Sequence, residues 1–578
     1  MIVLKTLAGQ VKEFVKPSIL TPLCMIAEVI AEMVIPLLVA SIVDDGIMKG
    51  DIACVVRVGA TMALVSLLGL FFGCMGARLG AFASAGFARN LRRSMYANIQ
   101  TFSFSNIDKF STAGLVTRLT TDITNVQMAY MMILRMCFRA PVSLIVAMYM
   151  AVRISARMSI IFLVALFVLV CVMVVLMKNT MGLFGQVFKK YDALNASVQE
   201  NISAIRVVKA YVREGYENEK FRTATANVQN LFMKAERMMV MAMPIMQLVM
   251  YSCILAMSWF GAGFIVKGEL STGNLMSLFN YCTMILMNLM MLSMVFVMMT
   301  MSKASAERIA EVLDEKSDLT NGDAPITEIK DGSIRFKGVN FSYRNRSNVL
   351  NNIDLEIASG ETIGIIGGTG SAKSSLVQLI PRLYDVTDGC IMVGGHDVRE
   401  YDLDTLRNSV AMVLQKNVLF SGTIYENMRW GDKNATDEEC REACRMACAD
   451  EFIERMPDGY NTYIEQGGTN VSGGQKQRLC IARALLKKPK ILILDDSTSA
   501  VDTATDSRIR DSFAKKIPGV TKIIIAQRIT SVQDADRIIV LSDGCISGVG
   551  THEELLANNA IYQEVFYSQQ KGGIEDGE

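Results

Sequence analysis

Net charge is almost absent from this chain. The formal charge at pH 7 is +1 over 578 residues, and no strongly basic patch occurs. Proteins that bind nucleic acid carry lysine and arginine clustered on one face, so we expect no nucleic-acid partner. Histidine is almost absent too, because His396 and His552 are the only two. Any step that needs an imidazole must therefore use one of these two positions.

The sequence also gives no sign of a disulfide framework or of a cleavable leader. The 13 cysteines are odd in number and scattered, so they suggest no set of pairs. Residues 1–17 carry lysines but no short apolar core with a small-residue cleavage site, and we expect no cleavable signal peptide. Cys440, Cys444 and Cys448 recur at helical spacing. A metal site is conceivable, but a small apolar helix face explains the period better, because both histidines lie elsewhere.

Long apolar runs, in contrast, are abundant. The hydrophobic fraction is 51% and the mean hydropathy is +0.31, values typical of a membrane protein. The runs fall in residues 1–310, whereas residues 330–570 have an ordinary globular composition. We predict a transmembrane domain at 1–314, a linker at 315–332, a nucleotide-binding domain at 333–570 and a tail at 571–578. The spans, each of about 20 residues or more, are expected near 17–43, 53–82, 126–152, 157–180, 238–266 and 274–301.

Two acidic residues fall inside the first expected span. Glu28 and Glu32 lie one helical turn apart, and Arg135 and Arg139 fall within or near another span. Charges at such depth are costly unless they face a cavity or a partner. One interpretation is a pathway for cationic, amphipathic substrate beside the glutamates. The other is a Glu–Arg pair that holds helices together or a span end in contact with water.

A phosphate-binding loop begins the globular half. Residues 362–366, TIGII, predict a short buried strand, and GGTGSAKS at 367–374 is followed by an amphipathic helix. Backbone N–H groups of such a loop attract phosphates, with Lys373 on the β- and γ-phosphates and Ser374 on Mg²⁺. Ala372 replaces the usual glycine, and we expect its methyl group to restrict the loop without abolishing binding, provided that φ is negative there. The loop residues are Gly367, Gly368, Thr369, Gly370, Ser371, Ala372, Lys373, Ser374 and Ser375.

Two further motifs complete a set. VSGGQKQR occupies 471–478, and ILILDDSTSAVD occupies 491–502, a buried strand that ends in Asp495 and Asp496. Together with the phosphate loop, these motifs resemble the ATP-binding cassette family. Nearly the whole chain resembles a half-transporter of the exporter type. The resemblance implies an α-helical six-span transmembrane domain followed by an α/β P-loop nucleotide-binding domain, with ATP and Mg²⁺ as cofactors.

The resemblance also assigns roles to residues. It implies that Tyr343 stacks on adenine, that Asp495 completes the Mg²⁺ site with Ser374, and that Gln415 touches both Mg²⁺ and the membrane domain. Cassettes pair head to tail, so one chain's signature completes the partner's site. The residues implied to act there in trans are Ser472, Gly473, Gly474, Gln475 and Asp502. Short coupling helices are expected around 104–122 and 210–220.

The chain departs from the family at its hydrolytic residues. The catalytic glutamate is replaced by Asp496, and the switch histidine by Gln527. Aspartate is one methylene shorter, a retreat of about 1.5 Å, whereas a general base needs contact near 3 Å. This paired loss resembles the degenerate chain of bacterial heterodimeric multidrug exporters. It implies poor hydrolysis at this site and a homologous partner with the glutamate and histidine intact.

The expected substrate is a hydrophobic or amphipathic small molecule reached through membrane lipid. An even number of spans, with the cassette in the cytoplasm, predicts a multi-pass protein of the cell membrane with both termini inside. Other interpretations stay open. The chain could form a homodimeric exporter with slow hydrolysis by Asp496, a lipid flippase or importer of the same fold, or a non-hydrolysing regulatory subunit.

Overall fold

The computed structural model describes residues 2–343, 347–497 and 499–575. The chain divides into two compact units. The first comprises Met1–Gln100 and Thr112–Glu315, and the second comprises Thr101–Ser111 and Lys316–Glu578. The short segment 101–111 therefore belongs with the C-terminal unit, although it interrupts the N-terminal helices in sequence.

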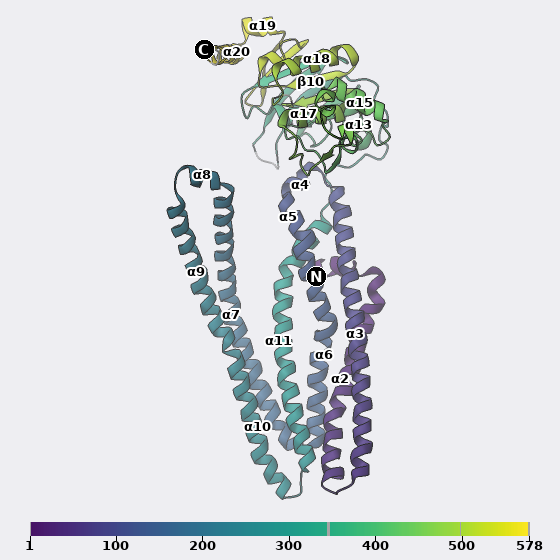
Figure 1. The fold of residues 1–578 in the computed structure, drawn as a ribbon, viewed down its shortest axis with the longest axis vertical. Helices are drawn as coiled ribbons and strands as arrows, with labels where there is room; N and C mark the ends of the chain where they lie inside the picture. The colour runs from purple at the N-terminus through teal and green to yellow at the C-terminus, as the bar shows by residue number, and fades with distance from the viewer. Residues whose placement is uncertain (1, 344–346, 498, 576–578) are drawn as a thin grey trace. The chain divides into compact units, whose positions relative to one another are not determined.

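The long elements of the first unit are all helices (Figure 1). Helix α7 packs against α9 and α10, whereas α2 packs against α3, α6 and α11. The helices are α1 (Ile2–Ala8), α2 (Val15–Ser41), α3 (Ile52–Gln100), α5 (Thr112–Thr117), α6 (Ile123–Ile154), α7 (Ala156–Ser203), α8 (Ile205–Ala210), α9 (Glu214–Val240), α10 (Ala242–Val266) and α11 (Thr272–Asp314).

Local sequence explains where these helices begin and how closely they pack. Ser155 and Ser271 are N-caps of α7 and α11, and their side chains accept hydrogen bonds from the N–H groups of Met158 and Asn274. Between α2 and α3, a Cβ at Gly76 would lie 2.3 Å from Met25 Cε. A side chain at position 76 would require the Met25 side chain to move, and it would also lie only 3.2 Å from Cys24 Cβ, so glycine favours close packing here.

Several of these helices are suited to a bilayer. Among the described residues, five helical stretches are long and apolar enough to cross a membrane. A shorter apolar stretch, Ala156–Val172, forms the first part of α7. The unit is therefore a membrane-embedded helical domain. The number of six spans stays a prediction, because the fourth expected span, 157–180, is matched only by this shorter stretch. The five stretches are Lys12–Ile47, Ile52–Gln100, Thr112–Ile154, Glu214–Val266 and Thr272–Asp314.

The second unit is built on β-sheets. The largest has the order β12-β11-β3-β10-β9-β6, and its members from β11 to β6 are parallel. A four-stranded antiparallel sheet has the order β2-β1-β4-β5, and β7 pairs with β8. The strands are β1 (Ile334–Phe341), β2 (Leu350–Ile357), β3 (Thr362–Gly367), β4 (Asp388–Val393), β5 (His396–Asp397), β6 (Val410–Val413), β7 (Gly422–Thr423), β8 (Tyr463–Ile464), β9 (Ile491–Asp495), β10 (Thr521–Ile525), β11 (Arg537–Ser542) and β12 (Cys545–Gly550).

The parallel strands bring the motif residues to one edge. Every residue of β9 and β10 is buried, as expected for strands covered on both faces. Ile525 of β10 lies opposite Asp495 on one side and Ile365 of β3 on the other. The phosphate loop after β3, the aspartates after β9 and Gln527 after β10 therefore meet at the carboxyl ends of neighbouring strands, where ligands bind in such sheets.

Helices of the second unit surround the sheets (Figure 1). Cys440 and Cys444 on α15 are buried in the core and contribute to packing. Among the described residues, no group of three or more His, Cys, Asp or Glu side chains could hold a metal ion. The helices are α4 (Phe104–Phe110), α12 (Lys373–Gln378), α13 (Leu403–Ser409), α14 (Ile424–Met428), α15 (Asp437–Met446), α16 (Asp450–Ile453), α17 (Gly473–Leu485), α18 (Thr503–Lys516), α19 (His552–Asn558) and α20 (Ala560–Glu575).

Candidate ATP site

The phosphate loop closes around its lysine. Lys373 Nζ donates hydrogen bonds to the carbonyls of Gly367 and Gly368, both at 2.8 Å, and approaches Ser371 Oγ at 3.4 Å. Burial lowers the pKa of Lys373, and the neighbouring Asp496 and Asp495 oppose that shift. The ammonium group thus lies inside the loop. Its hydrogen bonds to these carbonyls could be replaced by stronger ones to phosphate oxygens.

Ala372 adopts a left-handed conformation, with φ 69° and ψ 22°. The condition set for this position, a negative φ, is therefore not met. The loop must reverse direction immediately before α12, and that turn uses the left-handed region whichever residue occupies it. Alanine pays about 1 kcal/mol for this conformation, which glycine would adopt without strain.

A pair of oxygen donors lies beside the loop. Ser374 Oγ donates a hydrogen bond to Asp495 Oδ1 at 2.9 Å, and burial raises the pKa of Asp495. A hydroxyl and a carboxylate this close suit Mg²⁺, which prefers oxygen ligands and shares them with phosphates. Gln415 lies exposed in the loop after β6. Among the described residues, no hydrogen bond joins it to Ser374 or Asp495, and its contact with Mg²⁺ stays a prediction.

The two residues that depart from the family contact each other. Gln527 Nε2 donates a hydrogen bond to Asp496 Oδ2 at 2.7 Å. The Asp496 backbone is also fixed, because its N–H donates to the Ile525 carbonyl at 3.0 Å. Asp496 is buried, with the residue 9% exposed, and its backbone φ is +49°. The carboxylate that replaces the family's base is therefore held by an amide that, unlike imidazole, takes up no proton near neutral pH.

Tyr343, which is predicted to stack on adenine, lies in an aromatic cluster. Its hydroxyl is 3.0 Å from Ser375 Oγ, and its ring packs edge-on against Phe341 and Tyr384, with centroid distances of 4.7 and 5.2 Å. Burial raises the pKa of Tyr343, so the hydroxyl stays protonated at neutral pH. The cluster holds the ring beside the phosphate loop, although stacking on adenine is itself a prediction.

The signature motif forms the start of α17. Ser472 is the N-cap: its N–H donates to Gln475 Oε1 at 2.9 Å, and its Oγ accepts from the Gln475 N–H at 3.3 Å. A helix N-terminus of this kind attracts anions. A Cβ on Gly474 would lie 2.8 Å from the Ala500 carbonyl oxygen, whereas one on Gly473 would make an ordinary contact with Ala500 Cβ at 3.5 Å.

The loop between Asp496 and α18 contacts the signature helix. Gln477 Oε1 accepts from the Ala500 N–H at 3.0 Å, and Ser499 Oγ donates to the Asp496 carbonyl at 3.0 Å. Asp502 caps α18 by accepting from the Thr505 N–H at 2.9 Å. The loop that is predicted to reach the partner's cassette is thus fixed at both ends within its own chain.

The first expected coupling helix, α4, is part of the cassette unit. The Tyr384 hydroxyl donates to Asp108 at 2.9 Å, the Phe104 ring packs edge-on against Tyr384, and Asn106 Nδ2 donates to the Lys316 carbonyl at 3.2 Å. Sequence reasoning missed Tyr384, which also touches Tyr343. An aromatic residue soon after the phosphate-loop helix was the available signal, but nothing in the sequence pairs it with residue 108.

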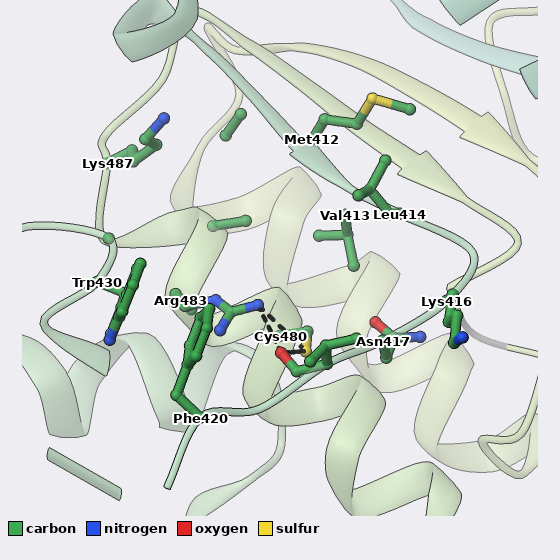
Figure 2. Close-up of a pocket in the computed structure, with 14 residues that line it drawn as sticks. Met412, Val413, Leu414, Lys416, Asn417, Phe420, Trp430, Cys480, Arg483 and Lys487 are labelled. Atoms are coloured by element: carbon green, nitrogen blue, oxygen red, sulfur yellow. Dashed lines mark hydrogen bonds between the residues drawn. The ribbon is translucent and has the colours of Figure 1, made fainter. Parts of the chain in front are cut away.

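Sequence reasoning also missed a surface groove on the cassette. A cavity of about 370 Å³ lies between β6, the following loop and α17 (Figure 2). Phe420 and Trp430 stack at one end with a centroid distance of 3.9 Å, and Arg483 donates to the Val418 carbonyl at 3.1 Å. The groove is therefore lined mainly by apolar side chains, with a stacked aromatic pair at one end. It lies next to the loop that carries Gln415.

The glutamates of α2 form ion pairs within the membrane unit. Arg139 of α6 lies 2.9 Å from Glu32 and 3.6 Å from Glu28. Glu28 also lies against Gly73 of α3, where a Cβ would be 3.2 Å from the carboxylate. This arrangement is the one described by the helix-pairing interpretation, and the substrate-pathway interpretation stays a prediction.

A phosphate loop on a parallel sheet, a signature helix and a membrane-embedded helical unit define an ATP-coupled membrane transporter. Comparison with known proteins agrees. Residues 18–290 match the family described as ABC transporter transmembrane region, and residues 350–499 match the family described as ABC transporter. The chain belongs to the ABC transporter family and is a half-transporter of the exporter type.

Individual relatives are similar over most of their length. An uncharacterized ABC transporter ATP-binding protein of Bacillus subtilis, YfiB, is 36% identical over 94% of this chain and 95% of its own. An ATP-dependent lipid A-core flippase of Syntrophus aciditrophicus is 30% identical over 86% and 84%. A bacterial Atm1-family ABC exporter with ATP bound has the same fold, with a TM-score of 0.82, 24% identity and coverage of 96% and 99%.

Proposed function

We propose that this chain is one subunit of a heterodimeric exporter and that its own ATP site binds nucleotide but hydrolyses it slowly. The hydrogen bond between Gln527 Nε2 and Asp496 Oδ2 carries the proposal. A general base must reach the attacking water at about 3 Å. Here the base is short by one methylene and is already engaged by an amide.

Nucleotide binding depends on other groups, and these are intact. Lys373 sits inside the phosphate loop, and the Ser374–Asp495 pair offers oxygen ligands for Mg²⁺. Tyr343 has a fixed place beside Ser375. Because none of these contacts involves Asp496 or Gln527, we expect Mg²⁺-ATP to bind where it is not efficiently cleaved.

The same chain would serve a second, hydrolytic site in trans. The signature helix presents its first turn, capped by Ser472, as an anion-binding end. A partner with the glutamate and histidine in place would hold its own ATP against this turn. The chain would then contribute phosphate contacts to rapid hydrolysis, although it lacks the base.

Coupling to transport would use the cassette groove. At the turn after α8, the adjacent residues Tyr211 and Val212 are 74% and 80% exposed, and adjoining exposed apolar side chains are available to a docking partner. We infer that the matching segment of the partner docks in the groove lined by Phe420 and Trp430. Closure of the two cassettes on ATP would then move the membrane helices.

The transported molecule is proposed to be amphipathic or hydrophobic. The membrane unit supplies apolar helices together with the charged Arg139–Glu32 pair. Similarity to lipid A-core flippases favours a lipid-like substrate as the more specific version of this proposal. Such a substrate would enter from the bilayer.

An ATPase measurement tests the heterodimer directly. The chain purified alone should release phosphate about 100-fold more slowly per site than the complex with a partner that carries both residues, which is the low end of what a general base contributes. Nucleotide binding to the chain alone should remain. If the chain alone hydrolyses ATP within about twofold of the complex, the homodimeric exporter replaces this proposal.

A further inference from the structure

The C-terminal helix α20 holds the segment that carries Gln527. Gln569 Nε2 donates a hydrogen bond to the Gln527 carbonyl at 2.7 Å, and Gln569 Oε1 accepts one from the Ile529 N–H at 3.0 Å. One side-chain amide therefore satisfies two backbone groups of the segment that follows β10. Backbone groups in irregular segments need such partners, and these two depend on a residue 42 and 40 positions away.

The helix that presents Gln569 is itself anchored. Tyr562 is fully buried, its hydroxyl lies 2.7 Å from His552 Nδ1, and its N–H donates to Asn559 Oδ1 at 2.9 Å. Positions 562 and 569 are seven residues apart, which is about two turns, so both face the cassette. Helix α20 lies next to α19 at the end of the chain (Figure 1). The buried Tyr562 thus anchors the helix on which Gln569 lies.

The contacts form a continuous series that ends at the site. Gln569 fixes the backbone at Gln527, and the Gln527 side chain donates to Asp496 at 2.7 Å. An amide nitrogen carries two N–H groups, and the Asp496 bond uses one. The second N–H is left for another acceptor, and a terminal phosphate held by Lys373 would be such an acceptor.

We propose that Gln569 is a positioning residue for this ATP site. By fixing the backbone at Gln527 and Ile529, it keeps the Gln527 amide aimed at Asp496 and at the terminal phosphate, and so slows nucleotide release. This inference rests on the proposed function, in which the site retains ATP.

The test is nucleotide release from the full-length chain. The chain is loaded with Mg²⁺ and a fluorescent ATP analogue, and release is timed after excess ATP is added. Gln569→Ala should release the analogue about three- to tenfold faster, the effect of losing one or two partly exposed hydrogen bonds. Gln570→Ala is the matched control, because it alters the same residue type one position further along an exposed stretch of α20. Release from the control should equal that from the wild type.

Two more variants separate positioning from packing. Gln569→Glu keeps the size of the side chain but places an oxygen against the Gln527 carbonyl, so it should release the analogue as fast as Gln569→Ala. In a Gln527→Ala background there is no amide to aim, and adding Gln569→Ala should change the release rate less than twofold. Failure of additivity of this kind identifies residues that act through one another.

Each outcome decides the matter. Equal release from Gln569→Ala and Gln570→Ala, or full additivity with Gln527→Ala, overturns the positioning role and leaves the proposed function standing. A wild-type chain that holds no analogue contradicts the proposed function, and the inference falls with it.

Discussion

Two parts of the same ATP site differ in what they preserve. The part proposed to bind phosphate and metal has Lys373, Ser374 and Asp495 in a hydrogen-bonded arrangement suited to Mg²⁺-ATP. In the part that would activate water, aspartate and glutamine replace the family's glutamate and histidine, and Gln527 donates a hydrogen bond to Asp496. The proposed function therefore separates binding from hydrolysis in this cassette. In that proposal the chain keeps the first and loses most of the second on an ABC cassette fold.

The largest effect should come from the binding part. Lys373→Ala removes the only charged donor inside the loop, and ATP affinity should fall about 100-fold, as expected for loss of hydrogen bonds to a charged group worth about 3 kcal/mol. Equilibrium titration of the chain with a fluorescent nucleotide measures this. Lys433→Ala, on an exposed loop, is the control and should bind normally. Unchanged affinity in Lys373→Ala would place the nucleotide elsewhere.

Turnover by the complex should depend more on the signature than on Asp496. Ser472→Ala or Gly473→Ala should lower phosphate release about 10- to 100-fold, because the helix end helps to stabilise charge on the transferred phosphate. Asp496→Asn should lower it less than about twofold, since its site contributes little. Steady-state phosphate release by the complex measures all three.

Gly473 is the sharper choice for this test. Alanine there meets Ala500 at an ordinary contact distance of 3.5 Å, whereas alanine at Gly474 would clash with the Ala500 carbonyl of its own chain. An effect at Gly473 therefore reports on the partner's nucleotide. An inactive Asp496→Asn complex beside an active Gly473→Ala complex would reverse the assignment of the two sites.

The smallest effect is expected at Ala372. Its left-handed conformation belongs to the path of the loop into α12, so relieving it should stabilise the fold more than it tightens binding. Ala372→Gly should stabilise the chain by about 1 kcal/mol and change ATP affinity less than about threefold. Thermal unfolding and nucleotide titration measure the two quantities. A tenfold gain in affinity would mean that the alanine itself weakens the binding part.

The sequence was a good guide to features encoded in short stretches. The phosphate loop, the signature and the buried β9 strand are each contiguous, so spacing and hydrophobicity predict their structures. The caps at Ser155 and Ser271 follow the same local rule. The cassette family and the membrane-embedded helices could therefore be predicted before any coordinates were known.

Contacts between distant segments could not be predicted in this way. The Asp496–Gln527 bond joins the ends of two strands 31 positions apart, and Tyr384 meets Asp108 across 276 positions. Side-chain direction at such distances follows from the whole fold. The positive φ of Ala372 was missed for a related reason, because the path of the loop overrides the preference of the residue. The Gln569 contact likewise depends on how α20 folds back on the cassette.

The most direct test of the account measures which nucleotide remains on this chain during turnover. The complex is run at millimolar concentrations of a photoreactive ATP analogue labelled at the α-phosphate, crosslinked, and separated into its two chains. The account predicts that this chain carries mostly uncleaved ATP while the partner carries ADP. It also predicts that the combined change Asp496→Glu and Gln527→His shifts this chain toward ADP, with each single change doing less. An unlabelled chain, or ATP cleaved here as fast as on the partner, would contradict the account.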